Sequence, residues 1–579
     1  MLIDARATRA KSRRGCKTCK IRRVKCGEEK PHCVRCSSTG RKCEYDVSIL
    51  NLHNPLSLSP NTVWRERRSF ASYFQHTAPY IGGGLDVAFW STVVPQVCRS
   101  EPAIWDAIIA VSALFETPEP PAPEFGPLSS WKKGQNHRDA LAWYARSVSA
   151  VRQRIERGRL DIFVGLISCI LFICIEGLQE GVEEAMRLYN QGVCLILTLR
   201  AQIAAGVVSA TKASLLEDTI VPIFDRLGAI ALPIGTRVHT LQRDTIDASR
   251  QEFISLKAAR EAAVSLAADV QFFEYICIEH LRETGASHVD QELLGQQTTL
   301  SARLSSWHTS VTNLLDSLRA KGLLSPQQTG TGALLLAHHE MLYTIVRTCT
   351  YPSLTATDAY LLNYQNIVEQ SSIALDASAR SDGTQPPYTF ELNIGVPLWF
   401  TCLRCREPQT RRMALALLRR APRVQGFSQR HSAVDFGERI MVLEERNAMK
   451  MNAPLTPLSP LSQSPSSSSS SSRISRFDPT VFLTTPNHEY APTPHSILSD
   501  INNNNNKISA AALIPEEARI GPVSIFRPQD GFPRGTTEQD IAKWKMRGPK
   551  QIFLRLSWNE HDVESDTWRT VHEYVPTTF

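Results

Sequence analysis

The 579-residue sequence predicts a mainly α-helical protein. We expect a small N-terminal two-zinc cysteine cluster module, a large all-helical domain, a disordered segment and a small C-terminal region. Three observations lead to this fold class. Six cysteines fall close together near the N-terminus, apolar residues recur at helical spacing over residues 63–450, and Ser and Asn runs interrupt the chain beyond residue 450. A hydrophobic content of 42% excludes a wholly disordered protein.

The basic charge is concentrated at the N-terminus. Residues 1–50 carry 14 Lys and Arg against 5 Asp and Glu, a local charge of +9, whereas the other 529 residues sum to −2. A compact basic segment indicates a polyanionic partner. We expect no membrane partner, because the longest apolar run, residues 162–175, is too short to span a bilayer, and the first residues lack the apolar region of a secretory signal.

The six cysteines follow the pattern C-x2-C-x6-C-x6-C-x2-C-x6-C, and the second three repeat the first three 17 positions later. They are Cys16, Cys19, Cys26, Cys33, Cys36 and Cys43. Zinc takes four tetrahedral ligands, so one ion would leave two thiolates unused, whereas two ions can share six thiolates if two of them bridge. The alternatives are a disulfide scaffold and a zinc clip without a nucleic-acid role.

The stretches GCKTCKIRRVKC, residues 15–26, and KPHCVRC, residues 30–36, resemble the zinc binuclear cluster transcription factors of fungi. The resemblance covers residues 15–45 and implies two structural Zn²⁺ ions. It implies that Cys16 and Cys33 bridge, that Cys19 and Cys26 complete one zinc site, and that Cys36 and Cys43 complete the other. Pro31 matches the family's proline in the loop that joins the halves.

The same resemblance implies that double-stranded DNA is the partner. Family members place a short helix of the basic run in the major groove and read a CGG triplet, which suits Arg because guanine offers O6 and N7 as adjacent acceptors. Arg23 and then Arg22 are the predicted base contacts. The predicted phosphate contacts are Lys20, Lys25 and, in the basic arm of residues 1–14, Arg13 and Arg14. For a single lysine, a solvated surface charge is the alternative.

Residues 46–62 are predicted to be a linker. Ile49, Leu56 and Val63 have heptad spacing, but Pro55 and Pro60 interrupt it. We therefore expect a monomer, or a homodimer formed through the helical domain.

Residues 63–450 are predicted to form stacked helical hairpins. A helix should begin at Pro102, and others are expected over residues 162–175, 185–199, 259–282, 332–348 and 410–418. ERRSF, residues 66–70, and SEPAIW, residues 100–105, are similar to the regulatory region of many filamentous-fungal members. That similarity implies a regulatory role.

Searches for enzyme motifs found no phosphate-binding loop, nucleophile elbow or H-E-x-x-H sequence. The stretch His338-His339-Glu340 is interpreted as a polar helix face, and the pair Cys402 and Cys405 as packing. We therefore predict no enzymatic activity.

Residues 451–511, which include a serine run and an asparagine run, are predicted to be disordered. In residues 512–579, acidic residues between Trp558 and Trp568 are typical of activation segments, but the alternation of Leu554, Leu556 and Trp558 favours a small ordered region with a strand.

Together these features predict a nuclear, sequence-specific regulator of RNA polymerase II genes that contacts transcriptional co-regulators. The alternative is a zinc-cluster scaffold or chromatin partner that binds nucleic acid non-specifically. An enzyme within the helical domain is a third, weaker alternative.

Overall fold

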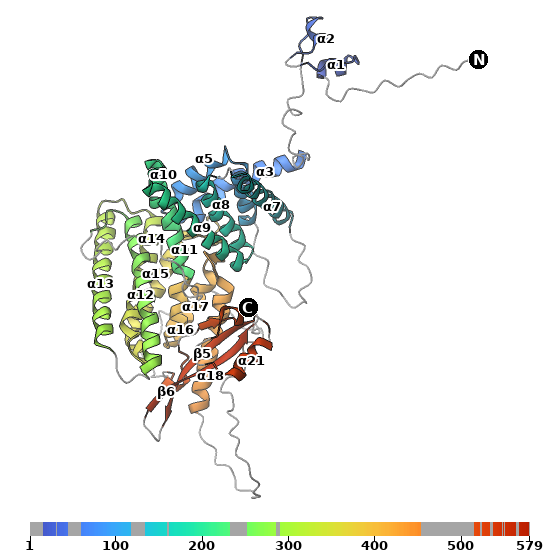
Figure 1. Cartoon of the computed structure of the whole chain (residues 1–579). Coiled ribbons are helices and arrows are strands. Elements are labelled where there is room, and N and C mark those ends of the chain that lie inside the picture. The colour runs from blue at the N-terminus through green and yellow to red at the C-terminus, as the bar shows by residue number, and fades with distance from the viewer. Residues whose placement is uncertain are drawn as a thin grey trace. The chain divides into compact units, whose positions relative to one another are not determined.

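A computed structural model describes most of the chain (Figure 1). It describes residues 16–29, 32–43, 60–116, 134–158, 161–231, 252–284, 290–452, 514–521, 524–532, 536–546, 548, 551–562 and 567–577. The chain divides into two compact units, Met1–Ala71 and Ser72–Phe579. The predicted disordered segment lies almost entirely outside the described residues, as do Arg13, Arg14 and Pro31.

The first unit contains two short helices, α1 (Lys17–Ile21) and α2 (Val34–Ser37), and most of a longer one, α3 (Pro60–Ser72). The linker boundary at residue 62 is wrong, because α3 begins at Pro60. Proline is tolerated in the first turn of a helix, where its missing N–H has no helical partner. Of the heptad positions, Ile49 and Leu56 lie outside the described residues.

The first half of the second unit is helical, as predicted. Its α-helices are α4 (Ala78–Ile81), α5 (Val94–Cys98), α6 (Pro102–Phe115), α7 (Gln135–Glu156), α8 (Ile162–Leu178), α9 (Val182–Ala204), α10 (Ala210–Leu215) and α11 (Val221–Ala231). Wider π-helical turns are η2 (Tyr73–Thr77), η3 (Phe89–Val93) and η4 (Leu216–Ile220).

Helix α8 is the apolar run of the sequence, and its burial explains that composition. Asp161 begins the helix by accepting a hydrogen bond from the backbone N–H of Phe163 at 2.8 Å. Helices α6 and α9 pack against it, so nearly every side chain of α8 is buried. No helix among the described residues is long and apolar enough to cross a membrane.

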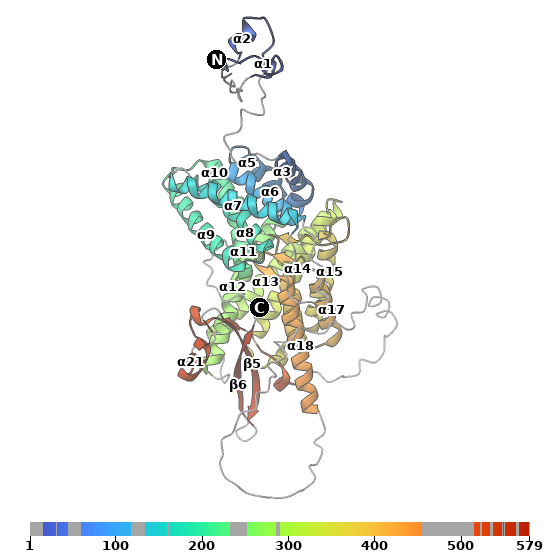
Figure 2. The same ribbon diagram turned by 90° about the vertical axis from the view of Figure 1, so that its right-hand side faces the viewer.

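The second half contains the longest helices of the chain (Figure 2). They are α12 (Leu256–Thr284), α13 (Gln291–Ala320), α14 (Pro326–Thr348), α15 (Leu361–Ser378), α16 (Gly395–Arg404), α17 (Pro408–Arg420) and α18 (Arg430–Asn452), with the 3-10 segment η7 (Leu354–Tyr360). Helices α12, α13 and α14 pack against one another around a shared apolar core that includes Trp307 and Val311. Helix α18 continues two residues past the predicted end of the domain at 450.

The all-helical prediction for this region misses a small sheet. Strands β1 (Tyr388–Thr389), β2 (Val424–Gln425) and β3 (Ser428–Gln429) are two residues each, with β1 parallel to β2 and β2 antiparallel to β3. Two residues are too few to show the alternation that identifies a strand in a sequence.

The C-terminal region is ordered where the structure describes it. Strands β4 (Ser524–Phe526), β5 (Ile552–Asp562) and β6 (Thr567–Thr577) form an antiparallel sheet, accompanied by α21 (Glu538–Met546), η8 (Glu516–Ala518) and η9 (Pro528–Asp530). Leu554, Leu556 and Trp558 of β5 are buried against Phe436 and Ile440 of α18. The described part is therefore a small ordered region, which was one of the two alternatives, and the acidic stretch between Trp558 and Trp568 lies partly outside the described residues.

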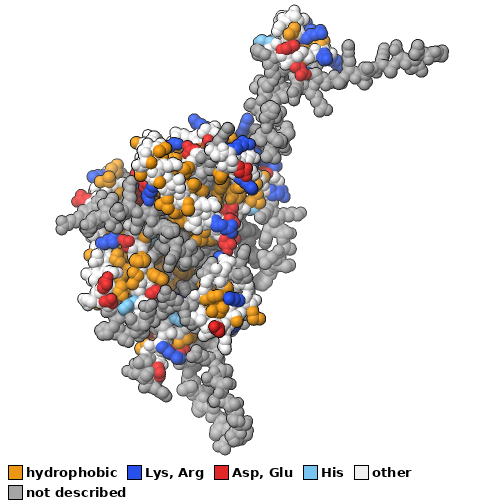
Figure 3. All heavy atoms as spheres, viewed as in Figure 1, with side chains coloured by type: hydrophobic (Ala, Val, Ile, Leu, Met, Phe, Trp, Pro, Cys, Tyr) orange, Lys and Arg blue, Asp and Glu red, His pale blue; other side chains and the backbone are white. Residues whose placement is uncertain are grey.

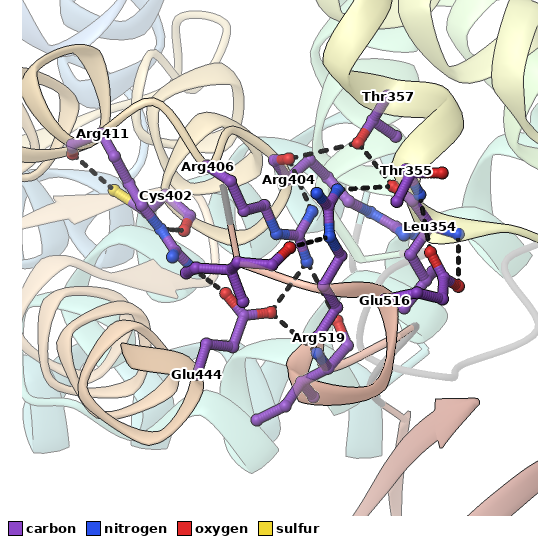
Figure 4. A network of polar contacts seen from close by, with 12 residues as sticks. Leu354, Thr355, Thr357, Cys402, Arg404, Arg406, Arg411, Glu444, Glu516 and Arg519 are labelled. Atoms are coloured by element: carbon purple, nitrogen blue, oxygen red, sulfur yellow. Dashed lines mark hydrogen bonds and ion pairs between the residues drawn. The ribbon is translucent and has the colours of Figure 1, made fainter. Parts of the chain in front are cut away.

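A buried ionic network also holds this region to the helices (Figure 4). Glu444 of α18 is fully buried and accepts hydrogen bonds from Arg406 at 2.8 Å, Arg411 at 2.6 Å and the backbone N–H of Ile520 at 2.7 Å. Arg519 pairs with Asp358 at 2.7 Å. Because the contacts of Ile520 with Glu444 and of Arg519 with Asp358 join residues 76 and 161 positions apart, the C-terminal region is part of the core of the second unit.

Candidate metal centre and nucleic-acid interface

The two cysteine repeats fold into two copies of one local structure. Cys16 precedes α1 with extended backbone (φ −60°, ψ 154°), and Cys33 precedes α2 in nearly the same conformation (φ −73°, ψ 144°). The backbone N–H of Cys16 donates to Cys26 Sγ at 3.3 Å, and that of Cys33 donates to Cys43 Sγ at 3.3 Å. The repeat in the sequence is therefore a repeat in structure.

The six sulfur atoms form two overlapping sets of four. One set is Cys16, Cys19, Cys26 and Cys33, and the other is Cys16, Cys33, Cys36 and Cys43; within each set all sulfurs lie within 4.8 Å of one another. Cys16 and Cys33 belong to both, as the bridging arrangement requires.

The sulfur separations fit zinc. Cys16 Sγ lies 3.8 Å from Cys33 Sγ and 3.6 Å from Cys36 Sγ, and Cys19 Sγ lies 3.7 Å from Cys33 Sγ. A Zn–S bond of about 2.3 Å gives a tetrahedral edge of about 3.8 Å. A disulfide would need a separation of about 2.05 Å, and these cysteines are free thiols. The six clustered cysteines therefore suit two structural zinc ions, and six thiolates are enough to complete both sites if Cys16 and Cys33 bridge.

Without metal, the thiols do not ionise equally. Burial raises the pKa of Cys36 to about 12, and hydrogen bonds with Cys33 and Cys16 add to the rise. Burial also opposes ionisation of Cys33, but hydrogen bonds from Cys36 and neighbouring thiols more than offset it and lower its pKa to about 6. Zinc binds thiolates, so it must displace protons from the cluster.

The module has little other than the metal to stabilise it. Its buried side chains, among the described residues, are those of the cysteines, whereas Ile21 and Val34 are 73% and 61% exposed. Side-chain contacts between the halves include the hydroxyl of Thr18, which donates to the carbonyl of Lys42 at 2.8 Å. A segment with so small a core folds because it binds zinc.

The predicted DNA-contact residues that the structure describes lie on one repeat. Lys20, Arg23 and Lys25 are exposed, and Arg22 is partly exposed, with its Nη1 donating to Thr39 Oγ1 at 3.4 Å. Lys and Arg side chains stand at the surface of the module beside a few acidic ones (Figure 3). Arg13 and Arg14 of the arm lie outside the described residues.

Arg23 has an unusual backbone. Its φ is +56°, in the left-handed region, where α1 ends. Its N–H donates to the carbonyl of Lys20 at 3.1 Å, and the N–H of Val24 donates to the carbonyl of Cys19 at 3.1 Å. This pair of bonds is the Schellman motif, which normally places glycine at the left-handed position. The equivalent residue of the second repeat, 17 positions later, is Gly40, with φ +59°.

The two repeats differ most in the charge that they present. Lys20, Arg22 and Arg23 correspond to Ser37, Thr39 and Gly40. Since both repeats build the same fold, the fold does not require basic residues at these positions. Arg23 even replaces the residue type that its backbone prefers.

A second group of ligand-type side chains is found in the helical unit. The structure brings His308 of α13 next to His339 and Glu340 of α14. The sequence singled out the stretch at 338–340 but not His308, which is 31 residues away. The polar-face interpretation is wrong for His338 and His339, because both are only 8% exposed. Burial lowers the pKa of His338 to about 4, and its Nε2 bonds the carbonyl of Asn393 at 3.1 Å.

Comparisons with known proteins agree with this geometry. Residues 14–51 match the family model of the fungal Zn(2)-Cys(6) binuclear cluster domain. The chain is 24% identical over 449 residues, 67% of each chain, to the aspercryptin biosynthesis cluster-specific transcription regulator atnN of Emericella nidulans. It is 29% identical over 125 residues to the Zn(2)-C6 fungal-type transcription factor afumD of Aspergillus fumigatus, which covers 19% of this chain and 34% of that one.

A shorter match, 43% identical over 54 residues, links 9% of this chain to 11% of the transcriptional regulatory protein moc3 of Schizosaccharomyces pombe. These relatives are regulators of transcription. The N-terminal module is therefore a zinc binuclear cluster domain of the fungal type, and with it the chain is a DNA-binding transcription regulator.

Proposed function

We propose that this DNA-binding regulator reads CGG-type triplets in the major groove through Arg23 and Arg22, and that it controls RNA polymerase II genes in the nucleus without catalysis of its own. The asymmetry of the two repeats carries the proposal. One repeat presents Lys20, Arg22 and Arg23 where the other presents Ser37, Thr39 and Gly40 on the same scaffold. Basic side chains that the fold does not need are best explained by a ligand that they contact.

Electrostatics support a nucleic acid as that ligand. With six thiolates and two Zn²⁺ ions, the first 50 residues keep a net charge of about +7, so the module attracts phosphate and should bind DNA with a marked salt dependence. Arginine can bond two acceptors of guanine at once, and each such pair discriminates by about 1–3 kcal/mol. Lys20 and Lys25 would contact phosphate, together with Arg13 and Arg14 of the arm.

The second unit would be the regulatory part. The alignment with the regulator atnN covers 67% of each chain and so extends well beyond the zinc module. Buried polar contacts, such as that of Glu444 with Ile520, link the helices and the C-terminal sheet within one compact unit. We propose that this unit receives the regulatory signal and contacts co-regulators. It would also form any homodimer.

The competing function is a scaffold or chromatin partner that binds nucleic acid without sequence preference. The test is fluorescence anisotropy of the zinc-loaded full chain on a CGG duplex and on a scrambled duplex, at several salt concentrations. Arg22→Ala is the diagnostic variant, and Arg41→Ala is its matched control, because Arg41 is an exposed arginine of the other repeat.

A specific reader should lose about 5- to 150-fold in CGG affinity on Arg22→Ala, the equivalent of 1–3 kcal/mol, with little change on the scrambled duplex. Arg41→Ala should keep the ratio between the two duplexes. Lys20→Ala should weaken binding to both duplexes by the same factor and reduce the slope of log affinity against log salt concentration by about one. If wild type binds the two duplexes equally, the scaffold alternative is correct.

A further inference from the structure

Three ligand-type side chains converge between α13 and α14, far in the sequence from the cysteine cluster. One ring nitrogen of His308, one of His339 and a carboxylate oxygen of Glu340 lie within 4.8 Å of one another. The two imidazole rings are 4.5 Å apart between centroids. Helices α13 and α14 pack side by side (Figure 1), so the group joins two elements of the core.

His339 is the member that most needs a ligand. It is only 8% exposed, and neither ring nitrogen has a hydrogen-bond partner among the residues that the structure describes. Its Nδ1 lies 3.6 Å from Glu340 Oε1, which is too far for a hydrogen bond. Burying a polar group without a partner is unfavourable, and native proteins rarely do so. A metal ion bound to one nitrogen would remove the penalty for that nitrogen.

The ring of His339 is held in position by its neighbours. It stacks on the ring of Trp307 and on the ring of Tyr343, with ring centroids 5.9 Å apart in each pair. Glu340 is held as well, because Asn363 Nδ2 donates to its Oε2 at 2.6 Å and leaves Oε1 for another contact. Supporting contacts of this kind orient ligands in metal sites.

The chemistry of the donor set also suits a cation. Two imidazoles and one carboxylate suit Zn²⁺, and three protein ligands leave the fourth position to water.

We propose that His308, His339 and Glu340 bind one divalent transition-metal ion of the zinc type, in a site separate from the cysteine cluster. The ion would link α13 to α14 within the proposed regulatory unit. His308 and Glu340 are partly exposed, so solvent reaches part of the group. The inference does not depend on DNA recognition, because its ligands and its test lie in the second unit.

The experiment uses the full chain with two equivalents of zinc already bound at the cysteine cluster. It is titrated with Co²⁺, a spectroscopic probe for zinc sites, and followed by calorimetry and visible absorption. We expect one further equivalent to bind with ligand-field bands and without new thiolate-to-cobalt charge transfer, since the ligands are nitrogen and oxygen. His308→Asn and His339→Asn should each weaken this step at least about tenfold, a loss typical even of supporting groups.

The matched control is His431→Asn, because His431 is an exposed histidine of the same unit. It should leave the third equivalent unchanged. Circular dichroism identifies any variant that misfolds, and His308 is the safer position because it is only partly buried. The proposal is refuted if wild type binds no further equivalent, if charge transfer appears with it, or if folded His308→Asn binds it as tightly as wild type does.

Discussion

Replacing Arg23 separates its backbone role from its side-chain role. Its φ of +56° lies in the left-handed region, where the second repeat has Gly40. A residue with a Cβ atom loses about 1–2 kcal/mol there, whereas glycine loses about 0.5–1 kcal/mol of extra chain entropy on folding. Arg23→Gly should therefore be neutral or stabilising by up to about 1.5 kcal/mol. Arg23→Ala keeps the strain and should be near neutral.

The two variants remove the same guanidinium, so DNA affinity can be compared at two levels of backbone strain. If Arg23 bonds guanine, both should lose about 1–3 kcal/mol, or 5- to 150-fold, on a CGG duplex and keep their affinity for a scrambled one. Module stability is read from competition for zinc with a chelator, because zinc binding and folding are coupled. A gain of 1 kcal/mol appears there as an approximately fivefold tighter apparent affinity.

Two results would refute this reasoning. If Arg23→Gly reads CGG as well as wild type does, the arginine is not a base contact. If Arg23→Gly competes for zinc less well than Arg23→Ala does, the left-handed backbone is not a source of strain. If Arg23→Gly and Arg23→Ala have the same zinc affinity and lose the same CGG affinity, the loss of DNA binding is still due to the missing side chain.

Three further predictions concern the metal and the second unit. Chelation of zinc should unfold residues 16–43 and abolish DNA binding while the helical circular dichroism of the second unit persists; a simultaneous loss of both signals would contradict the division into two units. Glu444→Gln should lower the free energy of unfolding in urea by about 3–5 kcal/mol, because it weakens the pairing of two buried arginines, whereas Glu445→Gln, which changes a partly exposed pair with Arg412, should cost less than about 1 kcal/mol. Burial raises the pKa of Asp225 to about 6, so the folded chain binds a proton there more tightly than the unfolded chain does. The resulting contribution to the free energy of unfolding is complete below about pH 4 and is lost as the pH rises through 6. Asp225→Asn should therefore stabilise the chain at pH 7, by on the order of 3 kcal/mol, and change its stability little at pH 4; an equal effect at both pH values would exclude the shift.

The parts of the fold that local pattern controls could be predicted from the sequence. Cysteine spacing predicted two equivalent halves. Both halves contain the same hydrogen bond, from the backbone N–H of Cys16 to Cys26 Sγ in one and from that of Cys33 to Cys43 Sγ in the other. The helix expected to begin at Pro102 begins there, and the apolar run at 162–175 is α8. Each of these signals lies within one element, where period and capping are visible in neighbouring residues.

The features that depend on distant residues could not be predicted. Strand β1 pairs with β2 across 36 positions, and Glu444 binds Ile520 across 76, so neither contact leaves a periodic pattern. For the same reason the proximity of His308 to His339 could not be predicted, because the two residues lie on different helices. The base contact of Arg23 is predicted from its motif position, and its positive φ, visible only in the structure, is a separate observation that motivates testing this residue.

The central claim is that one repeat of the zinc cluster reads sequence, and selection from random duplex DNA tests it most directly. The zinc-loaded full chain is incubated with the pool at near-physiological salt, beside Arg23→Gly. We expect enrichment of CGG-containing duplexes by wild type and loss of that enrichment in the variant. Selected duplexes with a single CGG triplet would indicate that the protein binds as a monomer, and duplexes with two triplets at a fixed spacing would indicate a dimer. Recovery of unenriched DNA by wild type would contradict sequence-specific reading and leave the module as a cationic clamp.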